Sequence, residues 1–280
     1  MTIELESVQR LARDIASASI TLSPTEARYL VDAYYTVQGY RIAAANQVRA
    51  LTESEEPHTV ISWLFTQMDV LEKQVARALK HWTSDKAEAQ WAQSIIGIGP
   101  VLSAGLLAHI DITKAPTVGH IWRFAGLDPT QEWGKGQERP WNADLKTLCW
   151  KIGESFVKVK GNDADIYGKV YDARKAEEIA RNDAGEFAGQ AESILTRKKI
   201  GKDTEAYKAY SVGKLPPGHL HARAKRYAVK LFLSHYHHVA YEVAFGIEPP
   251  KPYIIEHGHA HFLAPPNWPM VRSGHDLREE

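Results

Sequence analysis

The stretch Ile96-Gly97-Ile98-Gly99-Pro100, followed by the largely apolar residues 101–108, separates two segments of helical character. Glycine has no Cβ and adopts backbone angles that other residues avoid, so the two glycines favour a tight turn. Proline suits the first position of a helix, because its missing N–H would have no partner there. We therefore expect a helix over 87–95, a turn, and a second helix from Pro100, which together form a helix-hairpin-helix.

Such a turn offers unpaired backbone N–H groups and the positive end of a helix dipole, and both suit a phosphate. We expect the donors at Gly97, Ile98, Gly99 and Val101. These contacts do not recognise bases, so binding would be largely independent of nucleic-acid sequence. An ordinary corner in a helical bundle is the alternative, since the neighbouring apolar residues also fit plain helix packing.

Residues 1–86 predict a pair of helices. Ser23-Pro24-Thr25-Glu26 has the form of a capping box, and apolar residues then recur at steps of three and four over 30–51 and again over 61–82. This pattern favours an antiparallel, coiled-coil-like hairpin that forms a homodimer. A core-facing helix pair within one chain is the alternative. Arg41 interrupts the first apolar stripe, which suggests a pairing partner or an exposed seam.

The remaining chain also predicts an all-α fold. Gly126 is placed like a C-terminal helix cap, and Asn142 like the N-cap of a helix that runs to Lys160. We expect a helix-hairpin-helix domain over 87–245, with a polar, solvent-facing helical arm inserted at about 161–215. The segment 246–280 is rich in proline and aromatic residues and should form an extended tail.

Charge points to a local basic surface. The 280 residues carry no formal net charge, but residues 146–230 hold 18 basic and 11 acidic side chains, an excess of seven. A nucleic-acid interface on a neutral protein needs such asymmetry, although a solvated helix surface would also show it. The basic side chains expected at the interface are Lys135, Arg139, Lys146, Arg223, Arg226 and Lys230.

Composition narrows the class of protein. The single cysteine, Cys149, excludes an intramolecular disulfide and the cysteine-rich zinc modules. The first residues lack the basic start and apolar run of a signal peptide, and charges interrupt every apolar stretch before it could span a bilayer. We expect a cytoplasmic, nucleoid-associated protein with no membrane partner.

Three blocks in order resemble one protein family. They are the turn segment 94–100, the segment 121–129 with the following Gly134-Lys135, and the basic segment 222–231. Together they are similar to the C-terminal Tnp domain of insertion-sequence transposases of the IS-one-ten/IS-one-sixteen family, over residues 90–160 and 217–245. The resemblance implies DNA recombination by a mobile element, with an active site shared between this domain and a RuvC-like domain. Characterised members bind a structured guide RNA as well as DNA.

Two departures from the family pattern bear on catalysis. Residues 1–86 lack the alternating strands and spaced carboxylates of a RuvC-like domain and resemble only the family's coiled coil. The nucleophilic serine that the resemblance implies directly before Gly134 is Trp133 here, and an indole cannot attack phosphate. We therefore expect no catalytic residue that acts unaided.

Histidines in the tail raise the question of a metal site. His257, His259 and His261 alternate, so a strand would place them on one face, where neighbours could share a metal. No cysteine or carboxylate framework accompanies them. We expect no cofactor and no zinc, and magnesium only if the protein is catalytic with a partner.

The leading hypothesis is a transposase-like protein that binds the nucleic-acid backbone, with DNA favoured over RNA, and does not cut unaided. The first alternative is a transposase or recombinase component that becomes active with a partner subunit or a guide RNA. The second is a metal-binding enzyme that uses the C-terminal histidines.

Overall fold

The computed structural model describes residues 17–53, 59–134, 136–250 and 263–270, and within these ranges it contains helices and no strand. The predicted all-α class is therefore confirmed. The chain forms two compact units, one built mainly from residues up to 94 with 98–114, the other from 95–97 with 115–268. The sequence predicts a boundary at 86/87, whereas the first unit also contains α4 and α5 of the predicted helix-hairpin-helix: α5 packs on α2 and α3, and α4 packs on α5.

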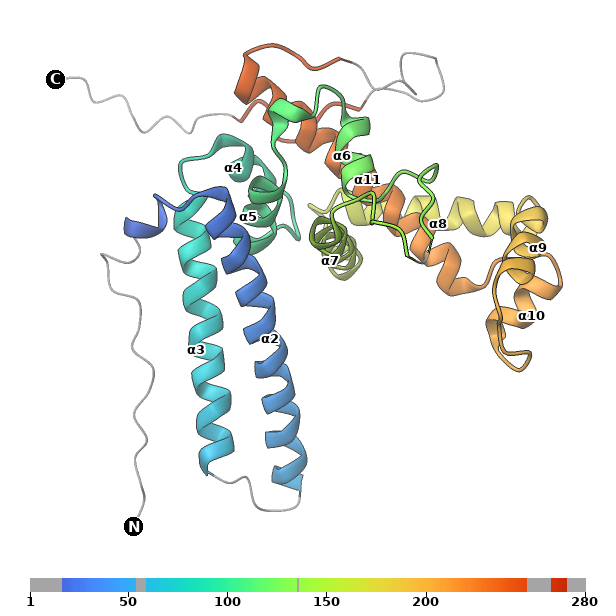
Figure 1. The fold of residues 1–280 in the computed structure, drawn as a ribbon, viewed down its shortest axis with the longest axis horizontal. Helices are drawn as coiled ribbons and strands as arrows, with labels where there is room; N and C mark the ends of the chain where they lie inside the picture. The colour runs from blue at the N-terminus through green and yellow to red at the C-terminus, as the bar shows by residue number, and fades with distance from the viewer. Residues whose placement is uncertain (1–16, 54–58, 135, 251–262, 271–280) are drawn as a thin grey trace. The chain divides into compact units, whose positions relative to one another are not determined.

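The first unit is built on two long helices that run side by side in opposite directions (Figure 1). The predicted capping box starts the first of them: Glu26 accepts the Ser23 backbone N–H at 2.7 Å, and the Glu26 N–H bonds the Ser23 Oγ at 3.3 Å. The helices of this unit are α2 (Pro24–Glu53), α3 (Thr59–Trp82), α4 (Ala87–Gln93) and α5 (Pro100–His109), followed by the 3₁₀ turn η1 (Ile112–Lys114).

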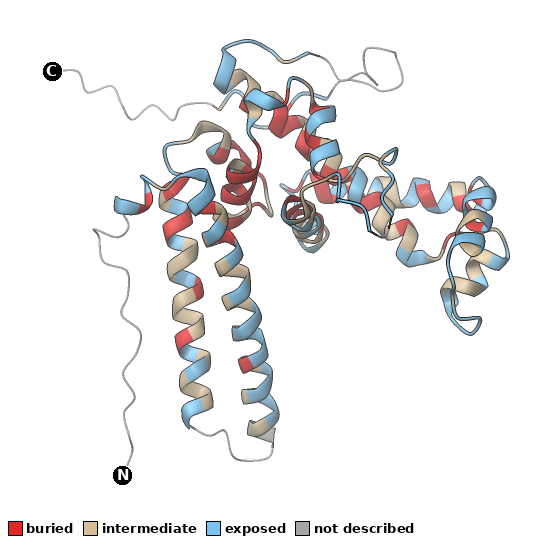
Figure 2. Ribbon diagram, viewed as in Figure 1, coloured by how far each residue is buried: buried red, intermediate tan, exposed pale blue. Residues whose placement is uncertain are grey.

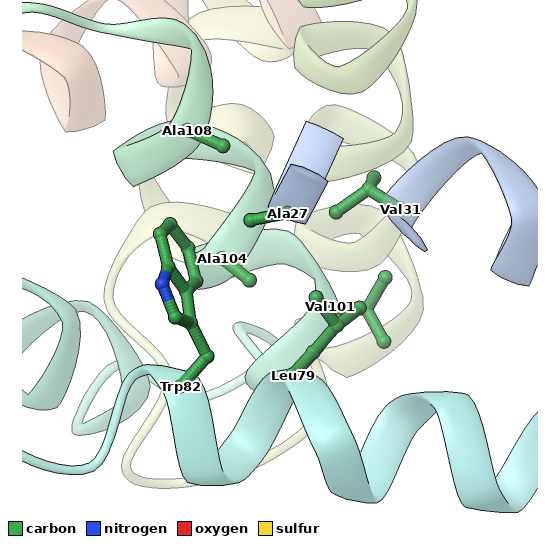
Figure 3. Close-up of a cluster of buried hydrophobic side chains, with 7 residues drawn as sticks. All are labelled: Ala27, Val31, Leu79, Trp82, Val101, Ala104 and Ala108. Atoms are coloured by element: carbon green, nitrogen blue, oxygen red, sulfur yellow. The ribbon is translucent and has the colours of Figure 1, made fainter. Parts of the chain in front are cut away.

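A small hydrophobic core joins α2, α3 and α5 at one end of this pair. Trp82 is buried, and its indole N–H donates to the Leu22 carbonyl at 2.8 Å. Figure 3 shows its ring beside Ala104 and Ala108 of α5. The small alanines let α5 approach the indole closely, and full burial of a Trp stabilises such a core strongly. The cluster comprises Ala27, Val31, Leu79, Trp82, Val101, Ala104 and Ala108.

Further along the pair, a polar network replaces the apolar seam. Arg41 pairs with Glu72 of α3, and the Gln38 amide donates to the same carboxylate at 2.9 Å. The partner expected for Arg41 is thus Glu72, which is 8% exposed. Burial raises the pKa of Glu72, but its bonds to Arg41 and Gln38 outweigh this and lower the pKa below its usual value.

The second unit is centred on the last long helix. Its helices are α6 (Val118–Phe124), α7 (Ala143–Val159), α8 (Tyr167–Asp183), α9 (Ala188–Arg197), α10 (Glu205–Ser211) and α11 (Pro217–Phe245). Phe156 of α7 stacks on Tyr167 of α8 at 4.9 Å between ring centroids, and both rings meet Phe232 of α11 edge-on. All three side chains are fully buried, so they form the core of this unit.

The expectation of a solvent-facing arm over 161–215 is wrong for α8. Tyr167 and Tyr171 lie one turn apart and are buried, and α8 packs along α11 (Figures 1 and 2). The tyrosine hydroxyls bond histidines of α11, Tyr167 with His235 at 2.6 Å and Tyr171 with His221 at 2.8 Å. The polar composition of this segment conceals a narrow aromatic stripe that is sufficient to bury one helix face.

The described part of the C-terminal tail, residues 263–270, is not helical and is bonded to α11. The Trp268 indole donates to Glu242 at 2.5 Å, and the His235 Nε2–H donates to the Leu263 carbonyl at 2.9 Å. Burial lowers the pKa of His235 to about 4, so its ring is neutral at pH 7 and its Nδ1 can accept the Tyr167 hydroxyl proton.

Candidate nucleic-acid interface

The two glycines of the 96–100 turn have different roles. Gly97 has φ +96°, and its carbonyl accepts the Ser155 hydroxyl at 2.5 Å. A Cβ at Gly97 would lie 3.1 Å from that hydroxyl oxygen. The positive φ and the close contact both require glycine here, so Gly97 serves the fold.

Gly99 is the N-cap of α5 and has an ordinary extended backbone, with φ −93°. A Cβ there would meet nothing within 4 Å. The expectation that both glycines are needed for the turn geometry is therefore wrong for Gly99. Its small size leaves space beside the helix start, where Val101 and Leu102 have no intrahelical acceptor for their N–H groups.

The side chains of Ile98 and Val101 are buried, at 4% and 8% exposure. Of these two residues, only the backbone N–H groups could therefore contact a phosphate, and the sequence analysis expects the contact through those groups.

The predicted basic residues fall into two groups. Arg223 is committed to the fold, because its Nε donates at 2.6 Å to Glu178, a carboxylate that is 1% exposed and also bonds Arg174. Lys230 lies over the Trp122 ring at 4.1 Å, and burial lowers its pKa. Lys135 lies outside the described residues.

Arg139, Lys146 and Arg226 form the second group. Burial lowers the pKa of Lys146, and the nearby charges of Arg226 and Arg139 lower it further. Arg226 has an exposed side chain, but the surrounding protein partly desolvates its guanidinium and lowers its pKa; the charge of Arg223 lowers the pKa further, and Glu178 opposes both effects. Within the described residues none of the three forms an ion pair with a carboxylate. These three residues are called here the cation cluster, a group of positive charges that no described carboxylate neutralises.

The segment 121–129 positions part of this cluster. α6 is followed by its cap residue Ala125 and then by Gly126 with φ +63°, and the Leu127 N–H donates to the Trp122 carbonyl at 2.8 Å; this confirms the predicted role of Gly126 at the helix C-terminus. Trp141 and Lys146 pack directly on Gly126, where a Cβ would lie 2.8 Å from the indole and 3.0 Å from the lysine stem.

The start of α7 also fixes the positions of Trp141 and Lys146. Asn142 accepts the Leu145 N–H at 2.8 Å as the predicted N-cap, and its own N–H donates to the Phe124 carbonyl at 2.8 Å. Lys146 follows one turn later, with its ammonium 3.9 Å from the centre of the Trp141 ring.

A pocket of about 380 Å³ opens beside these groups. Trp133, in the place where the resemblance implies a serine, forms one wall, and its indole N–H donates to the Gln137 carbonyl at 2.9 Å. Sequence reasoning missed Trp141 and Trp150 as site residues, although the alternation of indoles and cations between 133 and 150 was a usable signal. The lining residues are Trp133, Arg139, Trp141, Ala143, Lys146, Thr147 and Trp150.

Other reactive groups do not form a site in the described part of the chain. There, no three histidine, cysteine or carboxylate side chains gather as metal ligands, and His257, His259 and His261 lie outside it. Cys149 is buried, and burial raises the pKa of its thiol to about 12. It therefore offers no thiolate nucleophile at neutral pH.

No helix among the described residues is long and apolar enough to cross a membrane. No curated protein and no solved structure matches the chain. Residues 89–139 match the model of the Transposase IS116/IS110/IS902 family, a match that takes in the 96–100 turn, Gly126 and Trp133. The resemblance found in the sequence is thus confirmed over this segment, which is similar to a domain of these transposases.

Proposed function

We propose that this transposase-like protein binds double-stranded DNA through the phosphate backbone and does not cut it unaided. The observation that carries the proposal is the cation cluster: the charges of Arg139 and Arg226 both act on Lys146, and no carboxylate in the described part of the chain forms an ion pair with any of the three. Lysine and arginine that neutralise phosphates release condensed counterions, and this release supplies most of a sequence-independent affinity.

The start of α5 supports the same proposal. Gly99 leaves an open approach to a helix N-terminus, and the fold itself does not require glycine at this position. Backbone N–H groups at such an end suit an anionic oxygen.

The absence of unaided cleavage rests on Trp133. An indole has no nucleophilic oxygen, and the Ser155 hydroxyl donates to the Gly97 carbonyl. Incubation of the purified protein with duplex DNA and magnesium should leave the strands intact. Cleavage under these conditions would contradict this part of the proposal and favour the recombinase alternative.

We also propose that the N-terminal helices form a homodimer. Tyr29 and Tyr40 are 73% and 65% exposed and lie eleven residues apart on α2, which places them on one face. Val60 and Leu64, one turn apart on α3, are exposed as well, and Figure 2 shows little burial along most of both helices. Sedimentation equilibrium should report a dimer, and the double variant Tyr29→Glu/Tyr40→Glu a monomer.

The DNA-binding proposal is tested by fluorescence anisotropy with a labelled duplex across a series of salt concentrations. The logarithm of the affinity should fall linearly with the logarithm of salt concentration, by about 0.9 for each phosphate neutralised. Lys146→Gln should weaken binding, and Lys202→Gln, which removes an exposed loop cation outside the cluster, should change it little. An affinity that does not respond to salt would refute the proposal.

A further inference from the structure

The pocket beside the cation cluster, called here the tryptophan pocket, has features that backbone binding does not use. Trp133 and Trp150 are 45% and 57% exposed, although large aromatic side chains usually bury most of their surface. Trp133 meets Trp141 edge-on, with ring centroids 6.2 Å apart. At about 380 Å³, the pocket lies within the range of about 300–1,000 Å³ typical of small-molecule sites.

The charges at this pocket are all of one sign. Arg139 lies 5.3 Å from the Trp133 ring centre and Lys146 lies 3.9 Å from that of Trp141. The lining residues include no carboxylate. An occupant should therefore combine a flat apolar group, which stacks on an indole, with a negative charge, which meets the cations.

Nucleotides have this combination, because a planar base is linked to a phosphate. A base inside a duplex is stacked on its neighbours and cannot enter a pocket, whereas an unpaired base can. Proteins that bind single strands use the same pair of features, aromatic platforms for bases and cations for the backbone. An acidic peptide would satisfy the cations but would leave the exposed indoles without a planar partner.

We infer that the tryptophan pocket holds one unpaired nucleotide, with its base stacked on the indoles and its phosphate at Lys146 and Arg139. This inference rests on the proposed nucleic-acid binding and adds to it a preference for unpaired bases over a continuous duplex.

Contacts within the chain hold two walls of the pocket in place. Gly126 holds Trp141 and Lys146 by direct contact, and Trp133 is held by the Gln137 carbonyl. Side chains that are ordered before binding lose less conformational entropy when a ligand arrives, so more of the stacking energy contributes to affinity.

The test compares three labelled DNA probes: a fully paired duplex, the same duplex with one unpaired 2-aminopurine, and the same duplex with an abasic site at that position. The 2-aminopurine probe should bind more tightly than the abasic probe, by roughly 5- to 150-fold if stacking contributes its usual energy. Its fluorescence should fall on binding, because stacking quenches this base.

Trp133→Ala should lower affinity for the 2-aminopurine probe several-fold more than affinity for the paired duplex, and so reduce the preference for the base. Phe245→Ala, a similarly exposed aromatic at the end of α11, is the matched control and should keep the preference. If Trp133→Ala fails to fold, Trp150→Ala tests the same pocket from α7.

Equal binding of the 2-aminopurine and abasic probes, with unchanged fluorescence, would overturn the inference. If the paired duplex still bound in that case, the proposed function would stand. Failure of all three probes to bind would overturn both.

Discussion

Arg223 and Arg226 lie three residues apart on α11, and the protein uses them in opposite ways. Arg223 bonds Glu178 at 2.6 Å, and Glu178 is among the most deeply buried carboxylates that the structure describes, at 1% exposure. Arg226 is exposed and belongs with Arg139 and Lys146 to the cation cluster, with which no carboxylate of the described ranges forms an ion pair. The same residue type therefore stabilises the fold at one position and is available to a ligand at the other.

The difference shows why a count of basic residues in the sequence overestimates the number of cations available to bind a ligand. Lys225, between the two arginines, is buried and pairs with Glu154, so it too belongs to the fold. A buried ion pair contributes little to stability by itself, but the loss of one partner leaves an uncompensated charge. The structural and the available cations should therefore respond to substitution in different assays.

The largest effect should follow from breaking the structural ion pairs. Arg174→Met/Arg223→Met would leave buried Glu178 without its partners. We expect the free energy of unfolding to fall by about 3–5 kcal/mol, measured by urea denaturation. The matched pair Arg139→Met/Arg226→Met should change it by less than about 0.5 kcal/mol. Similar losses for both pairs would refute the division of the cations.

Acid should act on the same ion pairs. Burial raises the pKa of Glu178, but the bonds and charges of Arg223 and Arg174 outweigh burial and hold the pKa below the ordinary 4.5. A carboxyl with a lowered pKa in the folded state stabilises the protein fully above its unfolded pKa and loses this contribution as pH falls through the folded pKa. We expect stability to decline below about pH 4.5.

Glu178→Gln isolates this contribution to the acid response. Thermal unfolding as a function of pH should show a smaller decline below pH 4.5 for this variant than for the wild type. An identical decline would mean that Glu178 is not the group responsible.

The two turn glycines allow a similar comparison at smaller magnitude. Gly97→Ala places a side chain at φ +96° and 3.1 Å from the Ser155 hydroxyl, so it should destabilise by about 1–3 kcal/mol. Gly99→Ala meets nothing within 4 Å and should leave stability unchanged or slightly raised. Its effect should be on duplex affinity instead, and destabilisation by Gly99→Ala would contradict its assigned role.

Local signals in the sequence predicted the helix ends correctly. The capping box at Ser23, the helix start at Pro100, the cap at Gly126 and the N-cap at Asn142 all depend on residues a few positions apart. Such contacts are encoded within a single helical turn, so sequence patterns are sufficient to find them.

Features that depend on distant residues could not be predicted in this way. The pairing of Arg223 with Glu178 spans 45 residues, and the contact of Trp141 with Gly126 depends on how α6 meets α7. Arg139, Lys146 and Arg226 were among the predicted basic residues, but only the packing of α7 and α11 distinguishes them from Arg223. The tryptophan pocket was missed for the same reason.

The most direct test measures how duplex affinity depends on salt for Arg226→Gln and Arg223→Gln, at a temperature where both variants are folded. Loss of one phosphate contact should reduce the slope of log affinity against log salt by about 1 for Arg226→Gln. Arg223→Gln should keep the wild-type slope and show its effect in unfolding alone. A reduced slope for Arg223→Gln, or an unchanged one for Arg226→Gln, would contradict the division between structural and available cations.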